Sequence, residues 1–293
     1  KLINSIVRNN HANYNGGGLA LAHAPVKIIN TLITNNTCTN SGAGINVYNE
    51  NHKITNCTIV GNSPDGLGGG IRLQQNAHMV LLNSIIHSNE NGNIRLKPDS
   101  DDPISITISY SDIQGGQDSI VTNDNGTVIW GDGIIDTDPI FVDAASGNYR
   151  LSDYSPAIGA GTATGAPTTD IDGNIRPNPS GSTPDMGAYE NALGTPSAPP
   201  VPTNLAATVG NGLVNISWTG NDYATSYSVY RSTTSGSGFT AIATGLSTTS
   251  YQNTGLTNET TYYYKVSSTG HGGESNLTAE ISAKPKAQKY TVK

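Results

Sequence analysis

The sequence is poor in charged and aromatic residues and has no long apolar run. Only 13% of its 293 residues are charged, 6% are aromatic, and the net charge is −7. No cluster of lysine or arginine is present, which argues against a nucleic-acid partner because phosphate neutralisation needs such clusters. No segment approaches the ~20 consecutive apolar residues that a membrane-spanning helix needs, so we expect no membrane insertion.

The composition also excludes intrinsic disorder, which combines few apolar residues with a high net charge. The apolar fraction is 35% and glycine occurs 34 times, with abundant Asn, Thr and Ser. These residues favour turns and strands over helices. No secretory signal precedes the first repeat, so we expect the natural N-terminus and its signal upstream of Lys1.

A repeat of 26 or 27 residues runs through the N-terminal part of the chain. Its copies, NSIVRNN, NTLITNN, NCTIVGN and NSIIHSN, begin at Asn4, Asn30, Asn56 and Asn83. A glycine-rich motif with the same period begins at Gly16, Gly42 and Gly68. Short β-branched segments bounded by Gly and Asn indicate strands and turns. A leucine-rich repeat would need a regular leucine framework, which is absent.

Stacked coils, about 4.8 Å apart, would turn equivalent positions into columns. Four apolar columns are predicted: Leu2, Ile28, Ile54, Leu81; Val7, Ile33, Ile59, Ile86; Leu19, Ile45, Ile71; and Leu21, Val47, Leu73. One coil cannot bury its apolar side alone, but neighbouring coils bury it together. The sequence therefore predicts an all-β parallel β-helix with a long, thin core.

Asparagine forms two further columns, at 4, 30, 56 and 83 and at 10, 36, 62 and 89. The pattern resembles the asparagine ladders of pectate-lyase-like β-helices, in which one amide donates to the next. The alternative is a set of plain turn asparagines on the surface. Cys57 is expected as a small inward filler and Cys38 in a separate turn column, so we predict no disulfide between them.

The repeat ends after Ser109, and the stack needs a cap because its last coil exposes apolar side chains and strand edges. The aromatic residues expected to cover that end are Trp130, Phe141, Tyr149, Tyr154 and Tyr189. The segments DPIFVD, YRL, SPAIGAG, DIDGNIRP and DMGAYE follow in order between residues 138 and 190. They closely resemble the terminal segment of a bacterial family of secreted right-handed β-helix proteins with varied C-terminal anchors, the choice-of-anchor proteins. The resemblance implies a secreted or cell-surface location and no particular reaction.

A second domain follows a Pro-rich linker. Trp218, Tyr230 and Tyr262 occur in the order of a fibronectin type III domain, and Leu256, six residues before Tyr262, resembles that family's tyrosine corner. The predicted organisation is β-helix coils and cap at 1–193, linker at 194–204, fibronectin type III β-sandwich at 205–286 and a tail at 287–293. The tail has no anchor signal, so we expect further sequence beyond it.

Oxygen-bearing residues alternate in the segment DIDGN and suggest a calcium site. Asp170, Asp172 and Asn174 would supply oxygen ligands, and Asp185 would add another, since calcium takes several such ligands. The segment departs from an EF-hand because Gly181 stands where the bidentate glutamate would be. The alternative is an Asx turn without a metal.

Two arginines suggest a binding surface for an anionic sugar. Arg72 and Arg95 are the outward middle residues of successive IRL strands, and Lys97 and Tyr48 are expected nearby. Arginine suits carboxylate or sulfate recognition because its planar fork donates two parallel hydrogen bonds. The alternative is a pair of solvated arginines that offset an acidic chain.

A third candidate set combines histidines and acids: His52, His78, Glu50, Asp65, Asp99, Asp101 and Asp102. The two histidines are expected in neighbouring coils, where a pair can bind a metal or transfer protons. No family catalytic motif surrounds them, and solvent-exposed turn histidines are the alternative.

Our preferred interpretation is a non-catalytic extracellular stalk or adhesin that contacts a polysaccharide or a neighbouring protein domain at the cell surface. One alternative is a polysaccharide lyase or glycoside hydrolase whose site lies partly on upstream coils. A hydrolase needs two carboxylates at a defined separation, which these repeats do not show. Another alternative is a filament or assembly subunit, because the first coil begins at Leu2 without a capping segment.

Overall fold

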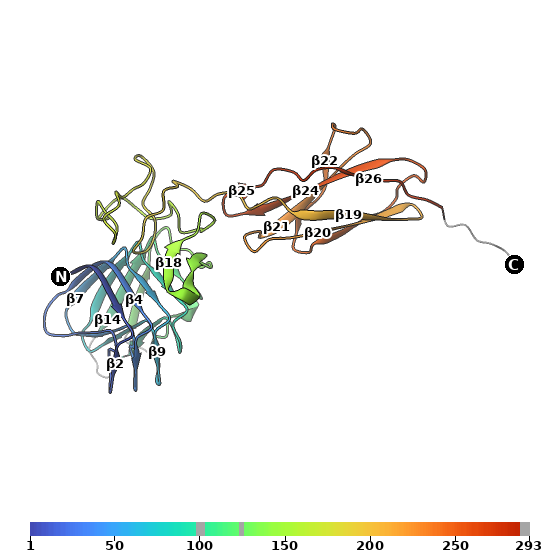
Figure 1. Cartoon of the computed structure of the whole chain (residues 1–293). Helices are drawn as coiled ribbons and strands as arrows, with labels where there is room; N and C mark the ends of the chain where they lie inside the picture. The colour runs from blue at the N-terminus through green and yellow to red at the C-terminus, as the bar shows by residue number, and fades with distance from the viewer. Residues whose placement is uncertain (98–102, 123–125, 288–293) are drawn as a thin grey trace. The chain divides into compact units, whose positions relative to one another are not determined.

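The computed structural model describes residues 1–97, 103–122 and 126–287. The chain divides into two compact units, Lys1–Pro196 and Ser197–Lys293, so the division falls inside the expected linker. The regular elements of the described residues are strands, apart from the short 3-10 helices η1 (Gln117–Ser119) and η2 (Ala144–Ser146), and residues 152–202 form a long segment without strands or helices (Figure 1). No helix in these described ranges is both long and apolar enough to cross a membrane.

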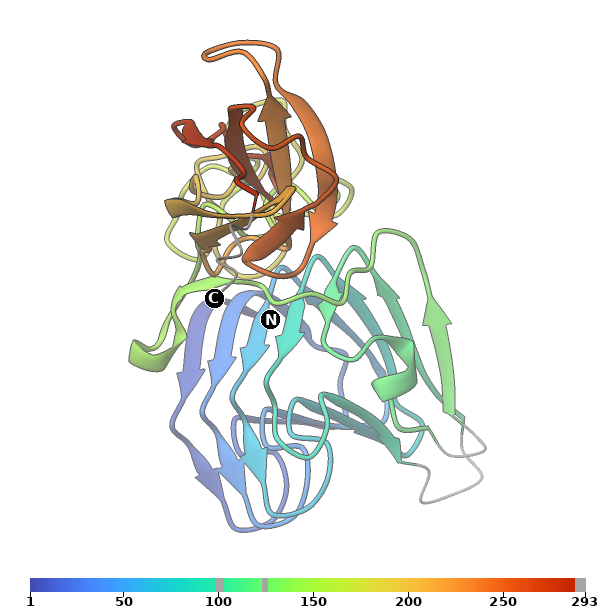
Figure 2. The same ribbon diagram turned by 90° about the vertical axis from the view of Figure 1, so that its right-hand side faces the viewer.

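The first unit is a solenoid of parallel strands in which successive coils lie side by side (Figure 2). The long sheet contains β1 (Leu2–Arg8), β4 (Lys27–Thr34), β7 (Asn51–Thr55), β8 (Thr58–Val60), β11 (His78–Leu82), β12 (Ile85–His87), β14 (Ile104–Ser109), β15 (Asp112–Ile113) and β16 (Gly126–Trp130). The arginine sheet contains β3 (Leu19–Leu21), β6 (Ile45–Tyr48), β10 (Ile71–Gln74) and β13 (Ile94–Lys97). The short sheet contains β2 (His11–Ala12), β5 (Thr37–Cys38) and β9 (Ser63–Pro64).

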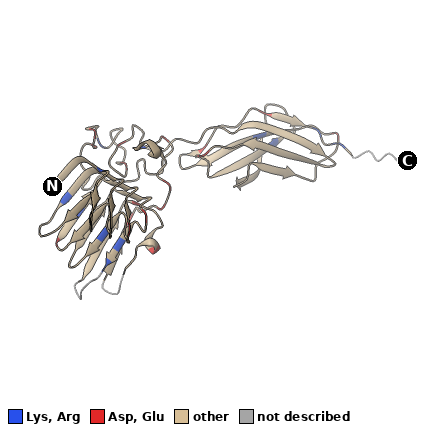
Figure 3. Cartoon of the chain, turned by 60° about the horizontal axis from the view of Figure 1, so that its bottom comes forward, with Lys and Arg blue, Asp and Glu red and all other residues tan. Residues whose placement is uncertain are grey.

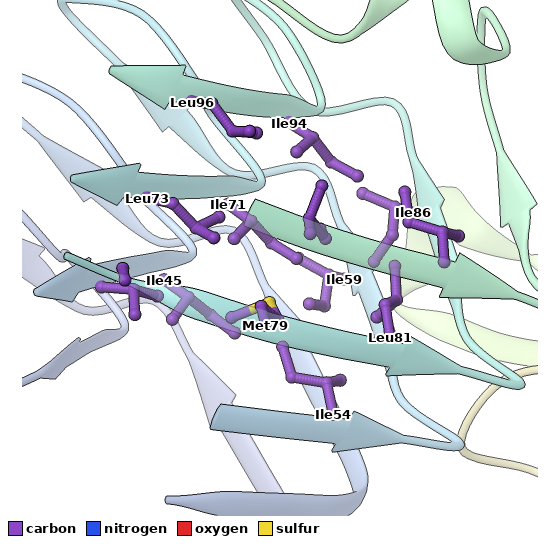
Figure 4. Close-up of a cluster of buried hydrophobic side chains, with 14 of the residues drawn as sticks. Ile45, Ile54, Ile59, Ile71, Leu73, Met79, Leu81, Ile86, Ile94 and Leu96 are labelled. Atoms are coloured by element: carbon purple, nitrogen blue, oxygen red, sulfur yellow. The ribbon is translucent and has the colours of Figure 1, made fainter. Parts of the chain in front are cut away.

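The register confirms that equivalent residues of successive repeats are stacked. One interior file runs from Val7 through Ile33 and Ile59 to Ile86. Figure 4 shows side chains from the long sheet and the arginine sheet meeting in the interior. Each fully buried Ile contributes roughly 1.5–3 kcal/mol relative to exposure, so the stack stabilises itself coil by coil.

The two asparagine columns have different structures. Asn10, Asn36, Asn62 and Asn89 form a ladder in which each side-chain nitrogen donates to the next side-chain oxygen, at 2.8–2.9 Å. Asn4, Asn30, Asn56 and Asn83 adopt positive φ angles of 48–50°, which asparagine tolerates better than most residues. Two of them also donate along their column, Asn30 to the Asn4 side-chain oxygen at 3.0 Å and Asn83 to that of Asn56 at 3.3 Å. These left-handed residues turn the chain between the two halves of the long sheet, so a ladder and a set of turns coexist in each repeat.

The segment after the last coil does not lie where the aromatic cap was expected. Trp130 packs against the solenoid core, but residues 138–193, here called the flanking segment, lie along the side of the coils. Phe141, Tyr149 and Tyr189 of this segment cluster with Leu32 and Val60. The flanking segment includes β17 (Phe141–Asp143), η2 (Ala144–Ser146) and β18 (Asn148–Leu151). Phe141, Tyr149 and Tyr189 thus cover a side of the solenoid rather than its end.

An outward column of the long sheet explains this placement. The column contains Ile6, Leu32, Thr58, Ile85 and Asp112. Its three middle members are buried, whereas Ile6 is exposed. Burial of this outward apolar surface stabilises the docked segment. Strand alternation alone would have assigned these positions to solvent.

The turn asparagines fasten the flanking segment to successive coils. The Asn30 side chain donates to the carbonyl of Thr169 at 2.7 Å. The Asn56 side chain donates to the carbonyl of Asp185 at 3.0 Å. Asn83 both donates to and accepts from the backbone of Thr162, at 2.8 and 2.9 Å.

The second unit is an antiparallel sandwich of two sheets. One sheet has the order β19 (Thr203–Gly210), β20 (Leu213–Thr219), β23 (Ser250–Asn253). The other has the order β22 (Thr240–Leu246), β21 (Ser226–Ser232), β24 (Tyr262–Gly270), β25 (Gly273–Glu274), with β26 (Ile281–Ala283) also paired to β24. This arrangement is that of a fibronectin type III sandwich. Trp218 lies in its core, and the hydroxyl of Tyr262 accepts a hydrogen bond from the Thr257 amide at 3.1 Å, closing the corner after Leu256.

Candidate binding face of the solenoid

The arginine sheet brings the four predicted sugar-binding residues onto one outward face. Arg72 lies beside Arg95, and Gln74 lies between Tyr48 and Lys97 in register. Because residues two apart on a strand share a face, these form two adjacent outward columns. Basic residues on the strands of the solenoid are visible in Figure 3. Arg72 aligns with Asn46 through the 26-residue period, whereas Arg72 and Arg95 are 23 residues apart and align through their shared IRL motif.

The glycine-rich motif makes room for the arginine side chains. Gly42 and Gly68 have φ angles of +70° and +75°, and a Cβ at Gly68 would lie 3.0 Å from the Cβ of Arg95. A Cβ at Gly42 would lie 3.2 Å from the Cβ of Arg72. Glycine is therefore required both for the left-handed backbone and for the close approach of the turn to the sheet.

Burial differs strongly across this face. Arg72 is only 3% exposed and Asn46 is completely buried, whereas Arg95, Lys97 and Tyr48 are half-buried. The Tyr48 hydroxyl accepts a hydrogen bond from Asn15 at 3.0 Å. Arg95, Lys97 and Tyr48 are therefore the members of the face that a ligand can reach.

This face also contains buried side-chain donors without a described acceptor. Nδ2 of Asn46 and Nε of Arg95 are buried and make no hydrogen bond to the described residues. The Asn46 side-chain oxygen already accepts from Gln74 at 3.1 Å. Buried donors normally find an acceptor, but these two atoms are enclosed, so a ligand on the outer surface would meet the exposed parts of Arg95 and Lys97 instead.

The residues predicted to bind calcium are engaged within the flanking segment. The Asp170 carboxylate accepts from the amides of Asp172, Asn174 and Glu190 and from the Asn174 side chain, at 2.8–3.1 Å. Asp172 pairs with Arg150. Every hydrogen bond to Asp170 holds a turn or joins this turn to Glu190, which matches the Asx-turn alternative.

Asp185 belongs to the same buried network. Its two carboxylate oxygens accept from the amides of Gly159 and Asn191 at 2.8 and 2.6 Å. Burial, followed by the neighbouring Glu190 charge, raises the Asp185 pKa to about 7. Within residues 1–97, 103–122 and 126–287, no group of three or more His, Cys, Asp or Glu residues is arranged to hold a metal ion.

An ion pair lies at the centre of the flanking segment. Nε of Arg176 and Oε2 of Glu190 are 2.6 Å apart, and both side chains are fully buried. Arg176 also donates to the Asn30 side-chain oxygen at 3.0 Å and to the Gly187 carbonyl at 3.2 Å. The pair therefore connects the flanking segment to the solenoid.

The two candidate histidines lie in adjacent coils but point to opposite faces. His52 is opposite Met79, whereas His78 is opposite Asn51. The His52 ring is buried and lies near the Val26 amide at 3.2 Å and the Asn49 carbonyl at 2.8 Å. These contacts assign the proton to Nε2 and give His52 a structural role. A shared metal or proton-transfer site on His52 and His78 is thus not formed.

Of the remaining acids in that set, only Glu50 and Asp65 lie in the described part of the chain, and neither forms a metal-holding group with the histidines. Glu50 is in a turn with φ of 65°, and Asp65 is exposed. Asp99, Asp101 and Asp102 lie outside the described residues.

One buried acid was missed at the sequence level. Asp112 is fully buried, its Oδ1 accepts from the Thr137 amide at 3.3 Å, and its Oδ2 has no partner in the described part of the chain. Burial, with the charges of Asp136 and Asp138 adding to it, raises the Asp112 pKa to about 7. The sequence does contain a signal for it: Asp112 is an acid at the position that Ile6, Leu32, Thr58 and Ile85 occupy in the preceding coils.

The cysteines take no part in these features. Cys38 and Cys57 are both buried and free. Cys57 lies in the solenoid core, where burial raises its pKa to about 12. A thiol with so high a pKa is a poor nucleophile because little thiolate is present.

The stacked parallel sheets and the asparagine ladder define the class of this protein as a parallel β-helix. The family model described as right handed beta helix region matches residues 1–151, and the chain belongs to that family.

Other similarities cover smaller parts of the chain. The amylopullulanases of Thermoanaerobacterium saccharolyticum and Thermoanaerobacter thermohydrosulfuricus are 39% and 40% identical over 90 residues, which is 30% of this chain in each case. The aligned residues span only 7% and 6% of those relatives. An Fn3-like protein from Clostridium thermocellum is 38% identical over 33% of this chain and 100% of that chain, with a TM-score of 0.29. A beta-1,2-glucanase from Parabacteroides distasonis is 21% identical over 37% of this chain and 15% of that chain, also with a TM-score of 0.29.

Proposed function

We propose that this protein is a secreted, cell-surface β-helix that contacts an anionic extracellular polysaccharide without cleaving it. The observation that carries the proposal is the register that places Tyr48, Arg72, Arg95 and Lys97 on one outward face of the arginine sheet. The similarity to amylopullulanases, enzymes named for polysaccharides, supports a carbohydrate-related role. The resemblance of residues 138–190 to the choice-of-anchor proteins supports a surface location.

A stacked sheet suits a polymeric ligand. Equivalent side chains recur about every 4.8 Å along the stack, and a polysaccharide presents equivalent groups at regular intervals. Arginine and lysine would pair with carboxylate or sulfate groups, and the Tyr48 ring would contact the apolar face of a sugar. Arg95, which is half-buried rather than enclosed like Arg72, is the residue that we assign to an anionic oxygen.

Affinity electrophoresis through gels that contain a polyuronate, a sulfated glucan or a neutral glucan tests this function. The anionic polymers should retard the protein and the neutral glucan should not. Arg95→Gln should weaken the retardation by about tenfold, because a charged hydrogen bond contributes ~1.5–3 kcal/mol. Lys284→Gln is the matched control, since it removes a positive charge from an exposed ion pair with Glu259 in the other unit.

Two results would contradict the proposal. Equal retardation by neutral and anionic polymers would show that the basic residues do not bind the anionic groups of the polysaccharide. Release of unsaturated products that absorb in the ultraviolet, or of new reducing ends, would show that the protein is a lyase or a hydrolase instead.

A further inference from the structure

A hollow of about 430 Å³ lies between the solenoid and the flanking segment. Val60 and His87, from neighbouring coils, form its solenoid wall, and Asp138, Phe141 and Tyr149 contribute to the opposite wall. Its size is within the range of small-ligand sites, ~300–1,000 Å³, which combine apolar walls with a few polar groups. This hollow is separate from the residues of the arginine sheet.

The polar groups of the hollow converge from both walls. Nδ1 of His87 is 2.7 Å from the Ser88 hydroxyl, so Nε2 is the ring nitrogen left to face a ligand. Burial lowers the His87 pKa despite the opposing charges of Asp138 and Asp136, which favours a neutral ring that can donate or accept. Oδ1 of Asp138 accepts from the Ile140 amide at 2.9 Å, and its second oxygen remains for a hydroxyl donor.

The apolar groups of the hollow are aromatic and held in place. The rings of Phe141 and Tyr149 meet edge to face, with centroids 5.3 Å apart. The Tyr149 hydroxyl is fixed by a 3.0 Å hydrogen bond with Thr34. Ile140 also lines the hollow and has a φ of 47°, a costly backbone conformation for a β-branched residue. Such strain concentrates at ligand-binding positions.

A second hollow of about 220 Å³ adjoins the first at Tyr149 and includes Arg8, Thr34 and Asn35. Arg8 and Thr34 belong to the same register column as Val60 and His87 of the first hollow. Four consecutive coils at about 4.8 Å spacing give a column roughly 14 Å long. The two hollows therefore follow one line along the side of the solenoid, with Tyr149 between them.

We propose that these two hollows form one binding site for a neutral oligosaccharide, with a sugar ring at Phe141 and His87 and the chain continuing past Tyr149 toward Arg8. A sugar ring offers an apolar C–H face to Phe141 and hydroxyl groups to His87, Ser88 and Asp138. The Asp138 carboxylate accepts hydroxyl hydrogens but would repel a uronate, so the ligand here is neutral. This site is independent of the anionic-polymer contact proposed for the arginine sheet.

Titration with maltotriose and with cellotriose, followed by NMR chemical-shift changes, tests the site. Wild-type protein should bind at least one of these trisaccharides with a millimolar or tighter Kd. Asp138→Asn keeps the acceptor for the Ile140 amide but removes the charge, and should weaken binding by about tenfold. Ala144→Trp should abolish binding, because exposed Ala144 lines the first hollow and a bulky side chain there would fill it.

Two controls separate this site from other effects. Ala22→Trp places the same side chain at an exposed alanine of another turn and should leave binding unchanged. Arg95→Gln should also leave trisaccharide binding unchanged while it weakens retardation by anionic polymers. Absence of binding by either trisaccharide, or wild-type affinity in Ala144→Trp, would overturn the inference. If Asp138→Asn impairs folding, Ala144→Trp alone tests whether trisaccharide binding depends on the first hollow.

Discussion

Asparagine serves two structural purposes here, and the backbone decides which one. Asn62 has a fully buried amide that donates to Asn89 at 2.8 Å and to the carbonyls of Ile33 and Val60 at 3.1 and 3.3 Å. Asn56 has a φ of 49° and uses its amide to hold the flanking segment. The same residue type therefore satisfies polar groups inside the solenoid and fixes a second layer outside it.

The raised pKa of the buried Asp112 carboxyl group leads us to predict an unusual pH dependence of stability. Its pKa is raised from 3.8 to about 7 in the folded chain, so folding favours the protonated form. The unfolded chain loses this proton first as pH rises, and the free energy of unfolding falls between about pH 4 and pH 7. Asp112→Asn should match wild type near pH 4 and melt several degrees higher at pH 8, at ~2–4 °C per kcal/mol.

Thermal melts of both proteins between pH 4 and pH 8 measure this effect. Asp118→Asn, a change at an exposed acid, is the control and should show no comparable trend. A difference between Asp112→Asn and wild type that stays constant across the pH range would contradict the assignment.

At the scale of elements, the flanking segment depends on the buried pair Arg176 and Glu190. Arg176→Met would leave a buried carboxylate without its partner, which typically costs ~3–5 kcal/mol. Hydrogen exchange should become faster in the flanking segment while the interior strands of the solenoid stay protected. Arg150→Met is the matched control, because Arg150 forms a half-exposed pair with Asp172 and should cost ~1 kcal/mol or less. Equal effects of the two changes would contradict a special role for Arg176.

The repeat allowed the interior files of the first coils to be predicted, since the period of 26 or 27 residues sets their register as far as Ile86. The face containing Arg72 and Arg95 followed from the recurring IRL motif instead, since these two residues are 23 rather than 26 or 27 positions apart. The docking of the flanking segment could not be predicted from the sequence. Outward residues such as Leu32 and Ile85 look like ordinary surface positions until the segment that covers them is known. The calcium ligands proposed around Asp170 stay a prediction, because turns and calcium loops both require oxygen-rich side chains.

At the scale of the whole molecule, the two compact units should unfold as two calorimetric transitions. Tyr262→Phe removes the hydroxyl that accepts from the Thr257 amide and should cost ~1–3 kcal/mol. Only the transition of the second unit should move to lower temperature in differential scanning calorimetry. A parallel shift of the solenoid transition would show that the units are coupled.

The three ties at Asn30, Asn56 and Asn83 also restrict how this protein can change length. Removing residues 30–55 would delete one complete repeat and preserve the alternation of inward and outward side chains, because Asn56 would take the place of Asn30. The flanking segment would nevertheless lose an anchor point and become too long for the shortened side. The length of the flanking segment must therefore match the number of coils that it spans. Duplication or loss of a coil requires a matching change within residues 138–193.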